Sequence, residues 1–182
     1  MALSPDRLDR FARHIVLPEI GGPGQALLAG AHVALIGVGG IGSPALQYLA
    51  AAGIGTISLV EYDEVEPSNL QRQTIYREAD AGHSKGELAA LWVHAFDSDI
   101  EVHLHRRRLT AENAAGLVAG ADLVLDGCDN FATRLAVSDA CVASGIPLVS
   151  AAVGRFQGQV GAFAGHLPGE ACYRCFVCDA FD

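Results

Sequence analysis

Residues 26–60 contain no Asp, Glu, Lys or Arg, and this uncharged stretch constrains the fold more than any other feature. An apolar segment of this length either spans a membrane or is buried in a protein core. Six glycines fall between Gly37 and Gly55, and Pro44 interrupts the run, which does not suit a membrane-spanning helix. We therefore interpret the stretch as a buried strand, a turn, a helix and a second strand, and we expect no membrane partner.

Strands and helices alternate along the rest of the chain. Short apolar runs predict strands at 33–36, 56–60, 100–105, 121–125 and 147–152. Capping residues and amphipathic spacing predict helices at 43–53, 88–96, 110–120 and 130–144, with Thr110 as one cap. Residues 155–164 predict added antiparallel strands. The alternation predicts an α/β fold: a doubly wound, mostly parallel Rossmann-like sheet with antiparallel strands near the C-terminus.

The N-terminal segment is expected to be separate from this sheet. Ser4-Pro5-Asp6 predicts the start of a helix that continues to about Val16. Residues 17–25 contain two Pro and three Gly, which predicts an irregular arm. We therefore divide the chain into residues 1–30, the N-terminal helix and arm, and residues 31–182, the main domain.

The net charge of −9 argues against a nucleic-acid partner, which would require a basic face. The one basic run, residues 106–108, is interpreted as a solvated strand end. The N-terminus is charged where a signal peptide would be apolar, so a cytoplasmic protein without disulfides is expected.

A glycine-rich turn follows the first predicted strand and opens a helix. Its glycines are Gly37, Gly39, Gly40 and Gly42. In this position backbone amides and a helix N-terminus can approach phosphates, which predicts a nucleotide site. Glu61, at the end of the second strand, lies where a carboxylate can meet ribose hydroxyls. Since most such turns bind NAD or FAD, a nicotinamide-dependent dehydrogenase is one alternative.

The run from Asp63 to Gln73, D-E-V-E-P-S-N-L-Q-R-Q, favours a different class of nucleotide enzyme. It resembles the D-x-V-x-x-S-N-L-x-R-Q signature of the ThiF/MoeB/HesA family of adenylating enzymes, which are related to ubiquitin-activating enzymes. Further pieces match in the same order: R-F-A-R-H at residues 10–14, G-Q at 24–25, Lys85, and D-x-x-D-N at 126–130. The resemblance covers nearly the whole chain and implies that residues 31–182 form a nucleotide-binding adenylation domain.

The resemblance implies roles for the matching residues. Gly40 lies against the nucleotide phosphates, while Asn69, Arg72 and Lys85 hold the triphosphate, where donors and cations offset its charge. Asp129 binds Mg²⁺, although it could also cap a helix. The motif further includes Asp63, Ser68, Asn130 and Gln73, of which Ser68 and Gln73 could equally be turn and packing residues. The family usually has Asp at the position of Glu61.

Arg13 has the most unusual implied role. In matching enzymes this arginine reaches the ATP phosphates of the other subunit, which implies a homodimer. The alternative is a surface arginine on a helix.

The cysteine pair Cys172-x-x-Cys175 resembles the first half of the family's zinc site, in which a second pair lies much later in the chain. That second pair does not occur here, so we expect Zn²⁺ only in a longer form of the protein. Cys178 could be a third ligand, a sulfur-handling thiol or neither. Cys128 and Cys141 are interpreted as buried apolar residues.

The reaction implied by the resemblance is ATP- and Mg²⁺-dependent adenylation of the C-terminal glycine of a ubiquitin-like sulfur-carrier protein, either MoaD-like or ThiS-like. Molybdopterin, thiamine and other sulfur-transfer routes would share these residues. The dehydrogenase alternative leaves Asn69, Arg72, Lys85 and Asp129 without roles. A non-catalytic scaffold that binds the carrier is a second alternative.

Overall fold

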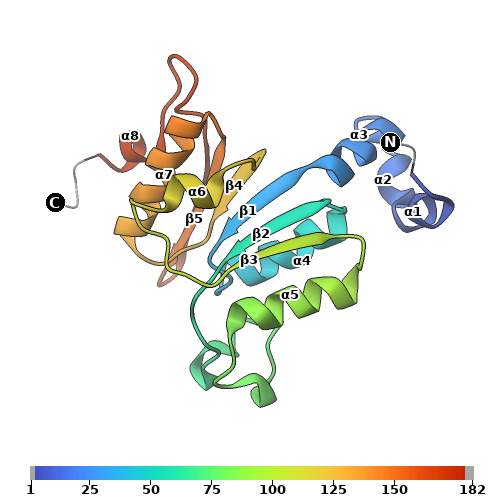
Figure 1. The fold of residues 1–182 in the computed structure, drawn as a ribbon. Coiled ribbons are helices and arrows are strands. Elements are labelled where there is room, and N and C mark those ends of the chain that lie inside the picture. The colour runs from blue at the N-terminus through green and yellow to red at the C-terminus, as the bar shows by residue number, and fades with distance from the viewer. Residues whose placement is uncertain (1–2, 179–182) are drawn as a thin grey trace.

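Six strands form one sheet in the order β3-β2-β1-β4-β5-β6 in the computed structural model, which describes residues 3–178 (Figure 1). Strands β1 to β5 pair in parallel, and β6 pairs with β5 in the antiparallel sense. The bounds are β1 His32–Ile36, β2 Thr56–Val60, β3 Glu101–His105, β4 Leu123–Asp126, β5 Leu148–Gly154 and β6 Gln157–Phe163. The predicted fold class is confirmed.

Each face of the sheet carries its own core. Val33 and Leu35 of β1 pack in a cluster with α4 (Gly42–Ala52) and α5 (Lys85–Phe96). The alternate residues Ala34 and Ile36 pack in a second cluster with α6 (Ala114–Val118), α7 (Phe131–Ser144) and α8 (Tyr173–Val177). Because successive strand residues point to opposite faces, β1 is buried on both sides, which explains its continuous apolar run.

The order in which successive strands are added to the sheet reverses between β1 and β4, although the two strands are parallel. From β1 the sheet continues to β2 and β3 on one side, and to β4 and β5 on the other. Ligands of open α/β sheets bind at such a switch point, beyond the carboxyl ends of the strands. The loops that follow β1 and β4 lie close together here, since a Cβ built on Gly37 would be 3.5 Å from the backbone of Gly127 and Cys128.

The N-terminal segment differs from the expectation of one helix and an irregular arm. It forms three helices, α1 (Pro5–Arg10), α2 (Ala12–Ile15) and α3 (Gly21–Gly30), which gather beside the start of β1 (Figure 1). Ser4 caps α1 as predicted. The arm prediction was wrong because Pro23 lies in the first turn of α3, where its missing N–H has no intrahelical partner to lose.

Buried contacts anchor these helices on the main domain. Phe11, which separates α1 from α2, is 2% exposed, and Gln25 of α3 is fully buried. The Gln25 amide donates to the Ala52 carbonyl at 2.8 Å, and its oxygen lies 2.9 Å from Nδ1 of His14. Arg7 pairs with Asp97 at the end of α5. No helix within residues 3–178 combines the length and apolar character that crossing a bilayer requires.

Two predicted helix starts were wrong, and one of these helices, α5, begins at Lys85 rather than at Leu88. Helix α6 begins at Ala114 rather than at Thr110, because residues 110–113 form a turn in which the Asn113 side chain accepts from the Thr110 amide. Helix α7 is capped by Asn130, whose side chain accepts from Thr133 N at 2.9 Å. Asp129 is therefore free of the capping role.

Candidate active site

A cleft of about 1310 Å³ lies at the carboxyl edge of the sheet, over the switch point. The ends of β1, β2 and β5 and the loops after β3 and β4 all contribute to its lining. Ten of the predicted site residues line it: Gly37, Gly39, Gly40, Glu61, Asp63, Asn69, Arg72, Lys85, Asp129 and Asn130. Segments far apart in the sequence are thus brought to one concave surface.

The glycine-rich turn needs its glycines for close packing. Gly37 has a φ of +82°, a left-handed conformation that favours glycine. A Cβ on Gly42 would collide with the carbonyl of Gly37, so this glycine allows the helix to start directly against the turn. A Cβ on Gly40 would lie 3.1 Å from the Arg72 side chain, which places that arginine against the turn.

Glu61 holds the glycine-rich turn. The residue is 5% exposed, and its carboxylate accepts from Val38 N at 2.7 Å. The other oxygen accepts from the amides of Tyr62 and Asp63 at 2.8 and 2.9 Å. The Glu61 side chain thus links the residues that follow β1 and β2, and Glu61 also belongs to the lining of the cleft.

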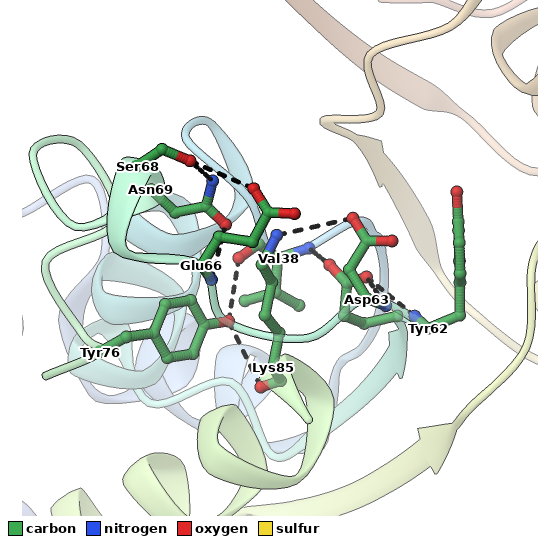
Figure 2. Close-up of polar contacts among 9 residues, drawn as sticks. Val38, Tyr62, Asp63, Glu66, Ser68, Asn69, Tyr76 and Lys85 are labelled. Carbon is green, nitrogen blue, oxygen red and sulfur yellow. Dashed lines mark hydrogen bonds and ion pairs between the residues drawn. The ribbon is translucent and has the colours of Figure 1, made fainter. Parts of the chain in front are cut away.

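Lys85 and Asp63 approach each other at the same edge. Lys85 begins α5 directly after its cap Ser84, and its Nζ lies 3.5 Å from Oδ2 of Asp63. The Lys85 side chain is only 7% exposed, whereas the Asp63 side chain is 50% exposed. The ammonium therefore has one carboxylate partner and is oriented by it (Figure 2).

The segment between β2 and α5 carries the signature residues. The short 3-10 helix η1 (Pro67–Asn69) is capped by Glu66, whose backbone N donates to Oδ1 of Asn69 at 3.4 Å. Ser68 donates to the Glu66 carboxylate at 3.1 Å (Figure 2). Arg72 donates to the Ser68 carbonyl at 3.2 Å. Ser68 thus organises the turn and is not in the lining, while Asn69 and Arg72 face the cleft.

A buried ion pair supports the loop that carries Asp129. Arg134 of α7 lies 3.3 Å from Oδ2 of the fully buried Asp126, at the end of β4. It also donates to Ser150 Oγ at 3.1 Å and to the carbonyl of Cys128. Since Cys128 directly precedes Asp129, this network determines where the Asp129 carboxylate is presented. Asp129 itself is exposed in the cleft.

The two buried cysteines offer no thiolate. Burial, together with the charge of Asp126, raises the pKa of Cys128 well above its usual range. The same causes raise the pKa of Cys141 to about 12. Cys141 is buried as predicted, but Cys128 is only partly buried and lines the cleft. It does so as a protonated thiol.

Five predicted site residues lie outside the lining of the cleft, and Ser68 in the turn after β2 is one of them. Arg13 is exposed on α2 and is not brought to the nucleotide side of its own chain. Cys172 and Cys175 lie at α8 with their sulfurs 3.4 Å apart, and Gly42 is buried behind the turn. Cys178 donates to the Cys175 carbonyl.

Several residues of the site were missed by sequence reasoning. All three arginines of the run 106–108 are exposed after β3, as a solvated strand end would be, but Arg107 and Arg108 also line the cleft, whereas Arg106 pairs with Glu87. The available signal was the position of Arg107 and Arg108 directly after a parallel strand, where ligands of open sheets bind. Tyr76 and Arg134 are buried supports of the site, and no local pattern marked them.

The fold and the cleft define a nucleotide-binding α/β protein, and comparison with known proteins identifies its family. A family model described as ThiF family matches residues 11–181. The chain therefore belongs to the ThiF family.

Curated relatives are similar over almost the whole chain. Adenylyltransferase and sulfurtransferase MOCS3 of Mus musculus is 48% identical over 174 residues, which are 96% of this chain and 37% of the relative. Sulfur carrier protein adenylyltransferase of Thermus thermophilus is 44% identical, over 96% of this chain and 66% of the relative. The chain thus spans between about two fifths and two thirds of the length of these relatives.

Solved structures share the fold. The E. coli tRNA N6-threonylcarbamoyladenosine dehydratase TcdA, in complex with ATP, has a TM-score of 0.77 and 30% identity, over 82% of this chain and 61% of that one. That neighbour holds ATP on the same fold.

Proposed function

We propose that this chain is the adenylation domain of an enzyme that activates the C-terminal carboxylate of a ubiquitin-like sulfur-carrier protein with ATP. The observation that carries the proposal is the convergence of Gly40, Arg72, Lys85 and Asp129 on one cleft at the switch point of the sheet. The relative named sulfur carrier protein adenylyltransferase supports the choice of substrate, and the one named adenylyltransferase and sulfurtransferase supports the reaction. Molybdopterin, thiamine or related sulfur-transfer biosynthesis would be the setting.

The proposed reaction is a substitution at phosphorus. An oxygen of the carrier's terminal carboxylate attacks the α-phosphorus of ATP, and the bond to the bridging oxygen of the β-phosphate breaks. Pyrophosphate leaves with that electron pair, and the carrier acyl-adenylate is formed. A carboxylate is already ionised near pH 7, so no side chain is needed as a general base.

The residues of the cleft would position the phosphates and offset their charge. Arg72 and Lys85 would contribute positive charge, and Asn69 would donate from its side-chain amide. Glu61, which belongs to the lining, would meet the ribose. A dehydrogenase would have no use for this group of cations.

Asp129 fits the proposed magnesium site. Mg²⁺ prefers one or two carboxylates together with phosphate oxygens and water, and Asp129 is an exposed carboxylate released from helix capping by Asn130. When bound, Mg²⁺ would neutralise charge on the phosphates as pyrophosphate departs. Asp63 shares the cleft but is paired with Lys85.

The described residues 3–178 do not supply a complete set of zinc ligands. Within residues 3–178 no group of three or more His, Cys, Asp or Glu residues could hold a metal ion. Cys172 and Cys175 provide two thiols of the four ligands that a structural zinc requires. We propose that Zn²⁺ binds only where a longer form of the protein supplies the remaining ligands.

Exchange of labelled pyrophosphate into ATP tests the proposal. We expect exchange only when a carrier ending in Gly-Gly is present, together with tighter binding of ATP than of NAD. Tighter binding of NAD would favour the dehydrogenase. Carrier binding without ATP binding would favour the non-catalytic scaffold.

A further inference from the structure

Tyr76 is a buried tyrosine whose hydroxyl joins two elements of the cleft. The residue is 5% exposed and belongs to the segment between β2 and α5. Its Oη lies 3.0 Å from the carbonyl of Val38 and 3.3 Å from the carbonyl of Lys85 (Figure 2). The hydroxyl proton is therefore shared between the glycine-rich turn and the first residue of α5.

Val38 is held from both sides. Its amide donates to Glu61 at 2.7 Å, and its carbonyl accepts from Tyr76. The two peptide planes on either side of Val38 are thereby fixed, and they lead directly into Gly39 and Gly40. Because a glycine-rich turn has unusual conformational freedom, such external contacts are what keep it in one shape.

Lys85 is fixed in a similar way. Its amide donates to the Asp63 carbonyl at 3.0 Å, its carbonyl accepts from Tyr76, and its ammonium faces Asp63. The backbone and side chain of this lysine thus have partners on the same edge of the sheet. Tyr76 connects this set of contacts to the contacts around Val38, beside Glu61, which accepts from the amides of both Val38 and Asp63.

We propose that Tyr76 is a positioning residue that couples the glycine-rich turn to the start of α5, so that the turn and Lys85 meet the nucleotide phosphates as one preorganised unit. This inference rests on the proposed nucleotide-dependent function and adds a residue to its machinery. A preformed site avoids the cost of ordering the turn when the nucleotide binds. Tyr76 itself touches no nucleotide in this proposal.

The hydroxyl is suited to a structural donor and not to proton transfer. Burial, followed by the nearby charge of Glu61, raises the pKa of Tyr76 far above its usual range. The group therefore stays protonated and keeps donating at any working pH. This separates Tyr76 from residues that would exchange protons with a substrate.

The test is Tyr76→Phe, which keeps the ring and removes only the hydroxyl. We expect calorimetric titration to show about tenfold weaker binding of ATP with Mg²⁺, the scale of one lost buried hydrogen bond. Binding of adenosine, which has no phosphates, should change by less than about twofold, because the turn and Lys85 act on the phosphate side. The ratio of the two affinities is the readout, since a loss of folded protein would weaken both equally.

Two controls make the result decisive. Tyr48→Phe alters an exposed tyrosine on α4 and should leave both affinities unchanged. Ile146→Val, in the core cluster around α7, should lower the melting temperature without changing the ratio. Unchanged ATP binding by Tyr76→Phe, or equal losses for ATP and adenosine, would overturn the inference. An unmodified chain that binds no ATP would instead overturn the proposed function, and this inference with it.

Discussion

Three carboxylates near the switch point differ in their partners, and the partners decide what each can do. Glu61 accepts from three backbone amides, so it holds the glycine-rich turn. Asp126 is fully buried and paired with Arg134, so it supports the loop after β4. Asp129 has neither arrangement and is exposed in the cleft. At the scale of single residues, Asp129 is therefore the one suited to a metal ion.

Asp129→Asn should separate metal binding from stability. The substitution removes the charge of the proposed Mg²⁺ ligand, and adenylate formation should fall by roughly a hundredfold or more. The melting temperature should hardly change, because Asn130 and not Asp129 caps α7. Pyrophosphate exchange at limiting Mg²⁺, measured beside thermal unfolding, checks both parts. Exchange at the unmodified rate would remove Asp129 from the metal site.

Two helices end on left-handed glycines, and the surroundings of each differ. Gly53 follows α4 with a φ of 82°, and Gly145 follows α7 with a φ of 71°. A Cβ at Gly53 would lie 2.5 Å from the Phe11 ring and 2.8 Å from the Gln25 amide, whereas a Cβ at Gly145 would have nothing within 4 Å. The end of α4 is therefore the surface on which the N-terminal helices pack.

Alanine at these two glycines forms a matched pair. Gly145→Ala should cost about 1 kcal/mol, the scale of a left-handed backbone for a residue with a Cβ. Gly53→Ala should cost about 1 to 3 kcal/mol more, because the N-terminal helices must shift as well. Urea unfolding of both variants gives the difference directly. Equal costs would mean that Phe11 and Gln25 are not held against α4.

The short helix α8 presents a pair of thiols that is incomplete as a zinc site. Burial raises the pKa of the Cys172 thiol, but hydrogen bonds from Cys175 and other neighbours outweigh this and lower it overall. A lowered pKa favours the thiolate that a metal requires. Even so, Cys172 and Cys175 are two ligands where structural zinc takes four.

We therefore expect the 182-residue chain to bind zinc weakly or not at all. Elemental analysis of purified protein, before and after dialysis against a chelator, measures this. One zinc per chain that resists the chelator would contradict the expectation and indicate that Cys178 or another subunit completes the site.

At the scale of the whole molecule, the N-terminal helices are fixed to their own domain. Phe11 and Gln25 are buried against the end of α4, so α2 cannot swing toward the cleft of its own chain without breaking these contacts. Arg13 is exposed on this fixed helix and away from that cleft. These contacts are consistent with an arginine presented to a second copy of the chain, and we propose a symmetric homodimer on this basis.

Mixing two inactive variants tests the dimer. Arg13→Ala should lower adenylate formation by about tenfold or more, because a guanidinium that contacts phosphates makes charge-assisted hydrogen bonds. When the Arg13→Ala and Asp129→Asn proteins are mixed, adenylate formation should recover in part, since one of the two sites in a mixed dimer would have both residues intact. Subunit exchange is verified by mass spectrometry of the mixture. Absence of recovery despite exchange would exclude action of Arg13 across an interface.

The sequence by itself determined the elements that depend on local pattern. Strand β2 was predicted with its observed bounds, and the start of α1 at Ser4 and the end of α4 at Gly53 were predicted correctly, because apolar runs, caps and left-handed glycines act over a few residues. The ordered signature around Asn69 and Arg72 was sufficient to indicate the family. These features need no knowledge of distant contacts.

Only the tertiary structure decided which residues support the site. Tyr76 and Arg134 make their contacts with residues distant in the sequence, such as Val38 and Ser150, and no local spacing marks such contacts. The choice of Asn130 over Asp129 as the cap, and the helical form of residues 21–30, also depended on surroundings. Local pattern specifies what a segment can form, whereas burial and the partners supplied by the fold select among the possibilities.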